Sequence, residues 1–154
     1  MSPNMTALLA CIRACEGTDG PDGYGALFGY RPGNGRVFTD FAQHPNRRFP
    51  FTQTDGKVNY SSAAGAYQII APTWWRLKAK MGLPDFSPES QDAAAVELIT
   101  EASALFDVEG GNLRVALDKC APIWASLPAS TYPQPKRSFF FAQNAYLAAG
   151  GVQT

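Results

Sequence analysis

The order of segment types along the chain most limits what it can fold into. A helical pattern over residues 2–15 is followed by a glycine-rich turn segment at 17–35, by β-prone runs within 36–61, and by helical patterns from residue 72 onward. The β-prone runs are 37–39, 49–53 and 58–61, and the turn signal Thr54-Asp55-Gly56-Lys57 separates the last two. This order predicts an α+β fold that is mainly α, with a small β lobe at about 36–61.

The helical patterns predict five helices. Pro3 suits a first helical position, and Ser87-Pro88-Glu89 places a cap, a proline and an early acid in order. The expected ranges are about 2–15, 72–81, 87–105, 112–120 and 136–149. No charged side chain occurs from Ser138 to Thr154, which predicts a core helix packed on several sides, with a partner-binding surface as the alternative. A length of 154 residues predicts one domain over 1–154.

Composition excludes several functions. Lys plus Arg and Asp plus Glu both number 13, so the net charge is zero and no nucleic-acid partner is expected. His44 is the only histidine, which excludes zinc hydrolases that need two or three imidazoles. Calcium-type aspartate spacing is absent, so we expect no metal and no organic cofactor.

Cysteines and hydropathy bear on location. Cys11, Cys15 and Cys120 are an odd number, and we expect them to be unpaired and buried. No apolar segment is long enough to span a bilayer, so no stable membrane anchor is expected. Arg13 interrupts the first apolar stretch, which argues against a classical signal peptide. These features predict synthesis in a reducing cytosol.

Glu16 is the first candidate for chemistry. It stands where the first helix should end, just before Gly17-Thr18. The negative end of the helix dipole disfavours an ionised carboxylate there, and nearby aromatic side chains would desolvate it further. A carboxyl group that keeps its proton near neutral pH is what a glycosidic oxygen needs as a general acid.

Short motifs follow one another in a fixed order between about Leu8 and Gly151. They are Glu16-Gly17-Thr18-Asp19, Gly23-Tyr24, Phe38-Thr39-Asp40, His44-Pro45, Ala64-Gly65-Ala66-Tyr67-Gln68, Trp74-Trp75, the run from Leu83 to Asp92, Cys120, Ile123-Trp124-Ala125-Ser126-Leu127-Pro128, Tyr132 and Gln134. In this order the motifs resemble those of the lambda-type phage endolysins, a family of lysozyme-like muralytic enzymes. The resemblance implies a lysozyme-like fold, with a helical lobe, a small β-sheet lobe and a cleft between them.

The resemblance also implies an activity. Lytic transglycosylases of this kind cut the β-1,4 bond between N-acetylmuramic acid (MurNAc) and N-acetylglucosamine (GlcNAc), and they leave a 1,6-anhydro ring. Glu16 would protonate the leaving oxygen and then accept the proton of the sugar's O6 hydroxyl. The implied partner is the peptidoglycan glycan strand. The enzyme would act as a monomer in the periplasm, after a holin releases it from the host cytoplasm.

Binding residues follow from the same resemblance. Ser61, Ser62, Tyr67 and Gln68 are expected to form one wall of the substrate site, and Tyr132 with Gln134 the opposing one. Gln68 matches the glutamine of the Gly-x-x-Gln motif found widely in transglycosylases. Trp74, Trp75 and Trp124 are expected in the core. The pairs Arg47-Arg48 and Lys136-Arg137 are expected near the lips of the cleft, as the local positive charge of a neutral protein.

Three departures separate this sequence from a relative of that family. Gly25 follows Tyr24 where the relative has Asp, which removes one candidate for a second acid. Ala66 stands where the relative has Arg, so we expect one basic contact to the substrate to be absent, and residues 30–36 form a longer stretch, so we expect a different lip over the cleft. A hydrolytic muramidase would need a second carboxylate, for which Asp19, Asp22, Asp40 and Asp55 are the candidates. A bacterial cell-wall effector toxin and a non-catalytic glycan-binding relative are further alternatives.

Overall fold

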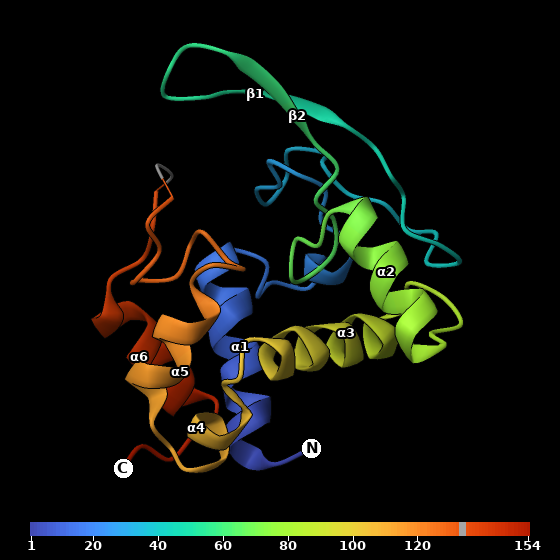
Figure 1. Ribbon diagram of the computed structural model, residues 1–154. Coiled ribbons are helices and arrows are strands. Elements are labelled where there is room, and N and C mark those ends of the chain that lie inside the picture. Colours follow the sequence, from blue (N-terminus) through green and yellow to red (C-terminus); the bar gives the residue numbers. More distant parts are fainter. Residues whose placement is uncertain (133–134) are drawn as a thin grey trace. The chain divides into compact units, whose positions relative to one another are not determined.

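The computed structural model describes residues 1–132 and 135–154. The chain forms two compact units, one of residues 1–16 with 95–154 and the other of residues 17–94. The elements are α1 (Pro3–Glu16), the single turn η1 (Gly23–Gly25), β1 (Phe49–Thr52), β2 (Val58–Ser61), α2 (Ala71–Met81), α3 (Pro88–Glu101), α4 (Leu105–Glu109), α5 (Leu113–Cys120) and α6 (Phe139–Ala148) (Figure 1). The α+β, mainly α prediction is confirmed. No helix in the described ranges is long and apolar enough to cross a membrane.

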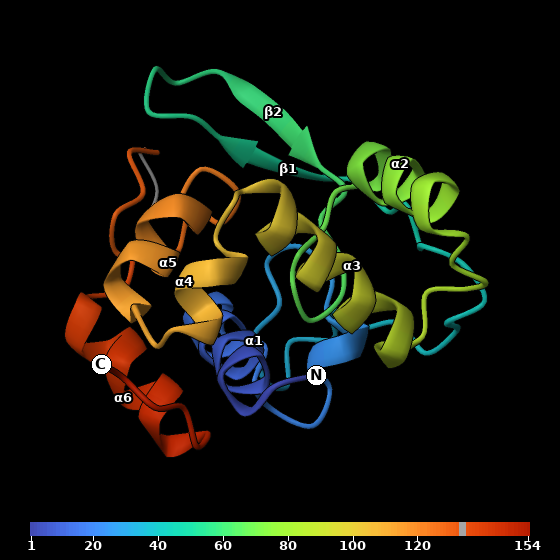
Figure 2. The same ribbon diagram turned by 60° about the horizontal axis from the view of Figure 1, so that its bottom comes forward.

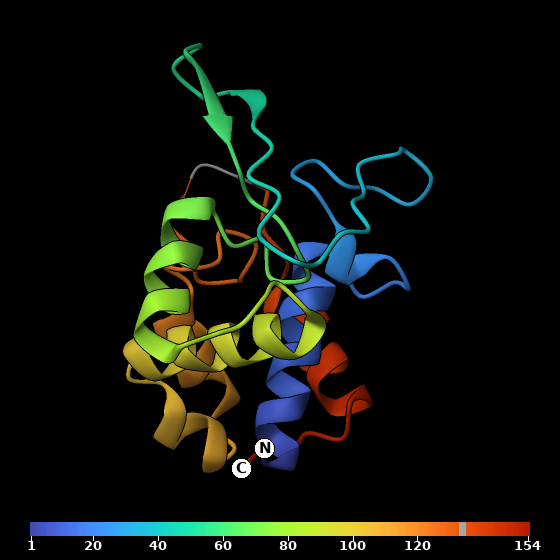
Figure 3. The ribbon, with the colours of Figure 1, turned by 90° about the vertical axis from the view of Figure 1, so that its right-hand side faces the viewer.

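In the first unit, α1 packs along α6, while α4 and α5 lie side by side (Figures 2 and 3). Leu8 and Ile12 of α1 are fully buried, as the helical spacing predicted, and each such burial stabilises the fold by about 1.5–3 kcal/mol. Cys11 donates its thiol hydrogen bond to the Ala142 carbonyl of α6. All three cysteines are free and buried, as expected.

The prediction that α6 would be packed on several sides was wrong. The helix buries Ala142 and Tyr146, whereas Phe140 is 71% exposed and Leu147 is 46% exposed. A helix without charged residues can be buried on every side, but whether it is buried depends on which other elements pack against it. The helix also begins later than expected, because the Ser138 side chain accepts a hydrogen bond from the Phe141 amide and so caps the first turn.

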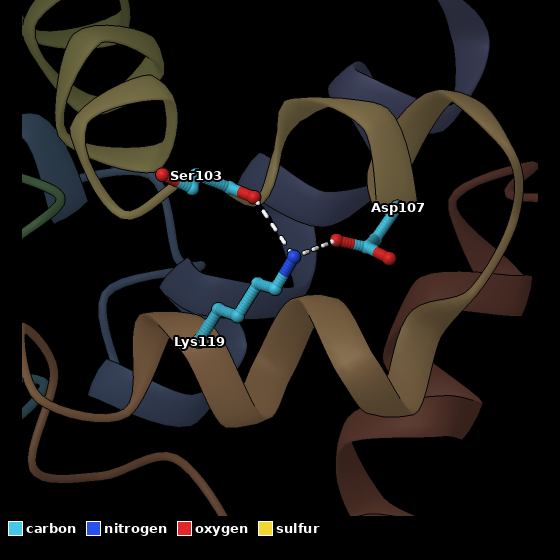
Figure 4. A network of polar contacts seen from close by, with 3 residues as sticks. All are labelled: Ser103, Asp107 and Lys119. Carbon is cyan, nitrogen blue, oxygen red and sulfur yellow. Dashed lines mark hydrogen bonds and ion pairs between the residues drawn. The ribbon is translucent and has the colours of Figure 1, made fainter.

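A single long helix over 87–105 was also expected, and the structure instead has α3, a break and α4. Ser103 at φ 58 lies in the left-handed region, and the Ala104 amide donates back to the Ile99 carbonyl, which closes the end of α3. Lys119 of α5 donates to the Ser103 carbonyl at 3.0 Å and pairs with Asp107 of α4 at 2.6 Å (Figure 4). This lysine fastens the break in the helix to α5.

In the second unit, β1 and β2 form an antiparallel hairpin that pairs Phe49 with Ser61 and Thr52 with Val58. The predicted turn joins them, with Gly56 at φ 82 and the Asp55 carboxylate accepting the Lys57 amide. The expected strand at 37–39 is reduced to one bridge between Ala26 and Val37.

Aromatic side chains build the core of the second unit. The Trp74 ring meets the Phe86 ring edge-on, with 4.6 Å between the ring centres, and the centre of the His44 ring lies 4.8 Å from that of Phe86. Trp74 and Trp124 are buried, as expected, whereas Trp75 is 52% exposed and its assignment to the core was wrong. Consecutive residues of one helix point about 100° apart, so the face that buries Trp74 leaves Trp75 outside.

Candidate functional site

Glu16 is the last residue of α1, and Gly17 at φ 75 ends the helix directly after it. The Ser126 hydroxyl, in the loop after α5, donates a hydrogen bond to Glu16 Oε1 at 2.7 Å. Burial raises the pKa of Glu16 from 4.5 to about 7, and the Ser126 hydrogen bond opposes that rise. A carboxyl group with this pKa can both donate and accept a proton near neutral pH.

Burial is the leading cause of the raised Glu16 pKa, because removing solvent penalises the ionised carboxylate directly. The sequence predicted a raised pKa from the helix end and from desolvation, and desolvation is the cause that the structure supports.

Buried neighbours hold Ser126 in place. Trp124 and Leu127 flank it and are 3% and 0% exposed. The Arg137 amide donates to the Ser126 carbonyl at 2.8 Å, and the Leu127 amide donates to the Trp124 carbonyl at 3.1 Å. The backbone that carries the Ser126 hydroxyl is therefore held by buried neighbours in the sequence and by hydrogen bonds.

Sequence reasoning did not select Ser126 as a site residue. It stands in the run Ile123–Pro128 that carried the resemblance. A serine between two apolar anchors is a weak signal, because the contact with Glu16 joins residues 110 positions apart.

The same loop carries one of the two predicted residues of the opposing wall. Tyr132 is 45% exposed, and its hydroxyl donates to the Pro122 carbonyl at 2.9 Å. Its backbone amide donates to the Ser130 hydroxyl. Gln134 lies outside the described residues.

In the second unit, the segment 64–69 forms a tight turn. The Ala64 and Ile69 backbones bridge each other, and Gly65 and Gln68 adopt φ values of 81 and 48. The Gln68 side chain donates to the Gly65 carbonyl at 2.9 Å. A left-handed glutamine costs about 1 kcal/mol or more, and such strain is most common at functional sites.

Tyr67 anchors this turn from inside. It is 1% exposed, and its hydroxyl donates to Asp92 Oδ1, the atom that also accepts the Tyr24 hydroxyl at 2.8 Å. The fully buried Gln91 accepts the Ala66 amide and donates to the Tyr24 carbonyl. Tyr67 thus positions Gln68 from within the unit.

Ser61 is the last residue of β2, Ser62 follows it directly, and both line one groove of the second unit. Ser62 is buried and accepts the Ala71 amide at the start of α2, while Ser61 accepts the Ala63 amide. Each hydroxyl keeps its own hydrogen for donation. The structure therefore brings Ser61 and Ser62 together, and it separately joins Tyr67 and Gln68 in one turn.

The candidate second acids all belong to the second unit and are exposed. Asp40 accepts the Ala42 amide and Asp55 accepts the Lys57 amide, so both have local roles in turns. Asp19 and Asp22 are the remaining two. Within residues 1–132 and 135–154, no three His, Cys, Asp or Glu side chains gather in a way that could hold a metal ion.

The pairs Arg47-Arg48 and Lys136-Arg137 are exposed, and their arginines lie near aromatic rings. The Arg48 guanidinium lies 5.9 Å from the Tyr60 ring centre, and that of Arg47 lies 5.5 Å from Phe49. The Arg137 guanidinium lies 4.6 Å from Phe141, and Lys136 donates to the Ser130 carbonyl.

Comparison with known proteins places this chain in a family. The endolysin family model matches residues 6–153. The chain is 34% identical to the endolysin of Escherichia phage P2, over 97% of this chain and 94% of that one, and 37% identical to the endolysin of Escherichia phage lambda, over 83% and 79%. The solved structure of bacteriophage lambda lysozyme complexed with a chitohexasaccharide matches with a TM-score of 0.87 at 32% identity, covering 100% of this chain and 98% of that one. With the lysozyme-like fold and an acid at Glu16, the chain belongs to the endolysin family.

Proposed function

We propose that this chain is an endolysin-type lytic transglycosylase that cleaves the β-1,4 bond between MurNAc and GlcNAc in peptidoglycan. The observation that carries the proposal is Glu16, whose pKa of about 7 suits both proton steps of a reaction that uses one carboxyl group. The whole chain acts as a single catalytic domain, in line with a family model that spans residues 6–153.

The first step breaks the glycosidic bond. Protonated Glu16 donates its proton to the oxygen that links the two sugars while the C1–O bond breaks, and positive charge develops at C1. The Ser126 hydroxyl occupies Oε1, which leaves Oε2 to carry the proton. As the carboxylate forms, the Ser126 hydrogen bond stabilises it.

The second step closes the anhydro ring. The O6 hydroxyl of the same MurNAc attacks C1, and the Glu16 carboxylate takes the O6 proton. No water is consumed, and Glu16 ends in its starting protonation state. The local turn contacts of Asp40 and Asp55 support a reaction with one acid, since hydrolysis would require a second carboxylate free to act.

Isotope labelling tests the reaction type. Purified peptidoglycan is digested in water enriched in heavy oxygen, and the products are separated and weighed by mass spectrometry. We expect 1,6-anhydro-MurNAc ends without heavy oxygen. Reducing MurNAc ends that carry the label would identify a hydrolytic muramidase and overturn the proposal.

We further propose that the enzyme acts in the periplasm after release through a holin pore. The support is its family of phage endolysins and the three free, buried thiols, which suit synthesis in a reducing cytosol. Expression without a holin should leave cells intact until the inner membrane is permeabilised. Lysis of unpermeabilised cells would contradict this route.

A further inference from the structure

The second unit contains a groove of about 520 Å³ beside the base of the hairpin and the start of α2. Figure 1 shows β2 leading down toward α2. The lining of the groove includes Arg48, Tyr60, Ser61, Ser62, Ile70 and Trp75. A volume of several hundred Å³ is that of a small-ligand site.

Buried contacts fix the walls of this groove. The Ser62 hydroxyl accepts the Ala71 amide, which ties the end of the hairpin to α2. His44 accepts the Asn46 amide at Nδ1, and its Nε2 donates to the Ile69 carbonyl at 2.8 Å. These bonds hold the segment before Arg48 against the segment before α2. The groove is therefore preformed.

The exposed part of the lining combines aromatic surface with one positive charge. Tyr60 is 55% exposed, Trp75 is 52% exposed and Ile70 is 44% exposed. Arg48 is the one charged residue among the described residues of the lining, and its guanidinium lies 5.9 Å from the Tyr60 ring centre. Across the described chain, no carboxylate forms an ion pair with Arg48.

We propose that this groove binds the acidic peptide stem that peptidoglycan carries on its muramic acid, with Arg48 pairing with a stem carboxylate. Trp75, Tyr60 and Ile70 then contact the aliphatic parts of the stem. A neutral N-acetylated sugar stacks on an aromatic face without needing a cation, whereas a peptide carboxylate matches the lone guanidinium. The proposal rests on the proposed function and adds a preference for glycan that carries stems.

Two arginines next to each other supply a matched test. Arg48→Gln removes the charge inside the groove, and Arg47→Gln removes the neighbouring charge, which is not part of the lining. Initial rates are measured on purified peptidoglycan with its stems and on glycan strands stripped of stems by an amidase. We expect Arg48→Gln to raise KM about 5–10-fold on the stem-bearing substrate only, with kcat unchanged, because a partly exposed ion pair is lost. Arg47→Gln should leave the ratio of the two KM values, stem-bearing over stripped, as it is in the unmodified protein.

Three outcomes would overturn the proposal. Equal effects of Arg47→Gln and Arg48→Gln would show a general effect of charge. If Arg48→Gln and Trp75→Ala each raised KM by the same factor on the two substrates, the groove would hold the sugar strand and not the stem. Equal KM values on both substrates for all proteins would show no stem recognition.

A binding measurement separates this proposal from the proposed function. Free acidic stem peptide is titrated into the labelled protein, and the Trp75 indole signal is followed by NMR. We expect a saturable shift that Arg48→Gln abolishes and Arg47→Gln retains. If the protein cleaves neither substrate, the proposed function fails, yet this titration still decides whether the groove binds the stem; the absence of a shift overturns the inference.

Discussion

The burial of Glu16 suits its proposed role in catalysis and also carries a structural cost. Burial keeps its proton near neutral pH, and the same burial makes its ionised form unfavourable in the folded protein. Ser126 moderates that cost with one hydrogen bond. The chemistry and the stability of this residue are therefore linked, and each can be measured.

Replacing Glu16 by Gln should abolish cleavage while leaving the fold intact. An amide can accept the Ser126 hydrogen bond but cannot donate or receive the catalytic proton, so we expect a loss of at least about 10²–10⁴-fold in the rate of muropeptide release. Lysis of permeabilised Gram-negative cells is the readout, with sedimentation onto peptidoglycan as the control for binding. Lysis at the normal rate would remove Glu16 from the mechanism.

The same variant should change how stability depends on pH. The pKa of Glu16 rises from 4.5 to about 7 on folding, so the folded state binds the proton more tightly. Its stabilising contribution is complete below pH 4.5 and is lost as pH rises through about 7. We expect Glu16→Gln to be more stable than the unmodified protein by about 3 kcal/mol at pH 8, and the gain should disappear near pH 4. Urea unfolding at both pH values checks this, and a gain that does not vary with pH would rule out the linkage.

Ser126 should act as a positioning residue through Glu16. Its hydrogen bond lowers the Glu16 pKa, so Ser126→Ala should raise that pKa further. Because the first step needs the protonated acid, the fall in kcat/KM at high pH should move to higher pH, together with a rate loss of roughly tenfold. Ser126→Thr keeps a hydroxyl and should restore the original profile. A lower rate with an unmoved pH profile would indicate a purely structural role.

At the scale of helices and strands, the local sequence pattern was enough to predict an element where one of its faces packs against the core. The spacing of Leu8 and Ile12 predicted α1, and the turn around Gly56 predicted the hairpin. Pattern failed where the outcome depended on partners elsewhere in the chain. The end of α3 depends on the left-handed Ser103 and on Lys119 from α5, and one face of α6 leaves Phe140 and Leu147 exposed.

Lys119 offers a test of how α3, α4 and α5 are joined. Its partner Asp107 has only 12% of its side chain exposed, so Lys119→Met leaves a poorly hydrated carboxylate and should lower the free energy of unfolding by about 1–3 kcal/mol. The matched control is Lys57→Met, which breaks a pair at 3.9 Å whose side chains are 80% and 53% exposed. That change should cost less than about 0.5 kcal/mol. Equal losses in urea unfolding would show that the Lys119 contacts do not stabilise the fold.

For the whole molecule, the family and the fold class could be predicted from the sequence, because the family's motifs follow one another along most of the chain. The position of Glu16 at a helix end could also be predicted, since it depends on local sequence. The burial of Tyr67 and the exposure of Trp75 depend on which side of a turn or helix meets the core, which the local pattern does not fix. The contact between Ser126 and Glu16 could not be predicted, because it joins residues 110 positions apart. The catalytic and binding roles themselves stay predictions.

The balance of 13 basic and 13 acidic residues predicts how the enzyme meets an anionic wall. A neutral protein has little long-range attraction to lose when salt shortens the Debye length from about 30 Å at 0.01 M to about 10 Å at 0.1 M. Electrostatic help then comes from local groups such as Arg48, which act at contact distance and are screened less. We expect the initial rate on purified peptidoglycan to change by less than about threefold over this range, whereas a strongly basic lysozyme assayed in parallel should slow much more steeply. A fall as steep as that of the basic enzyme would mean that long-range attraction governs encounter with the wall despite the zero net charge.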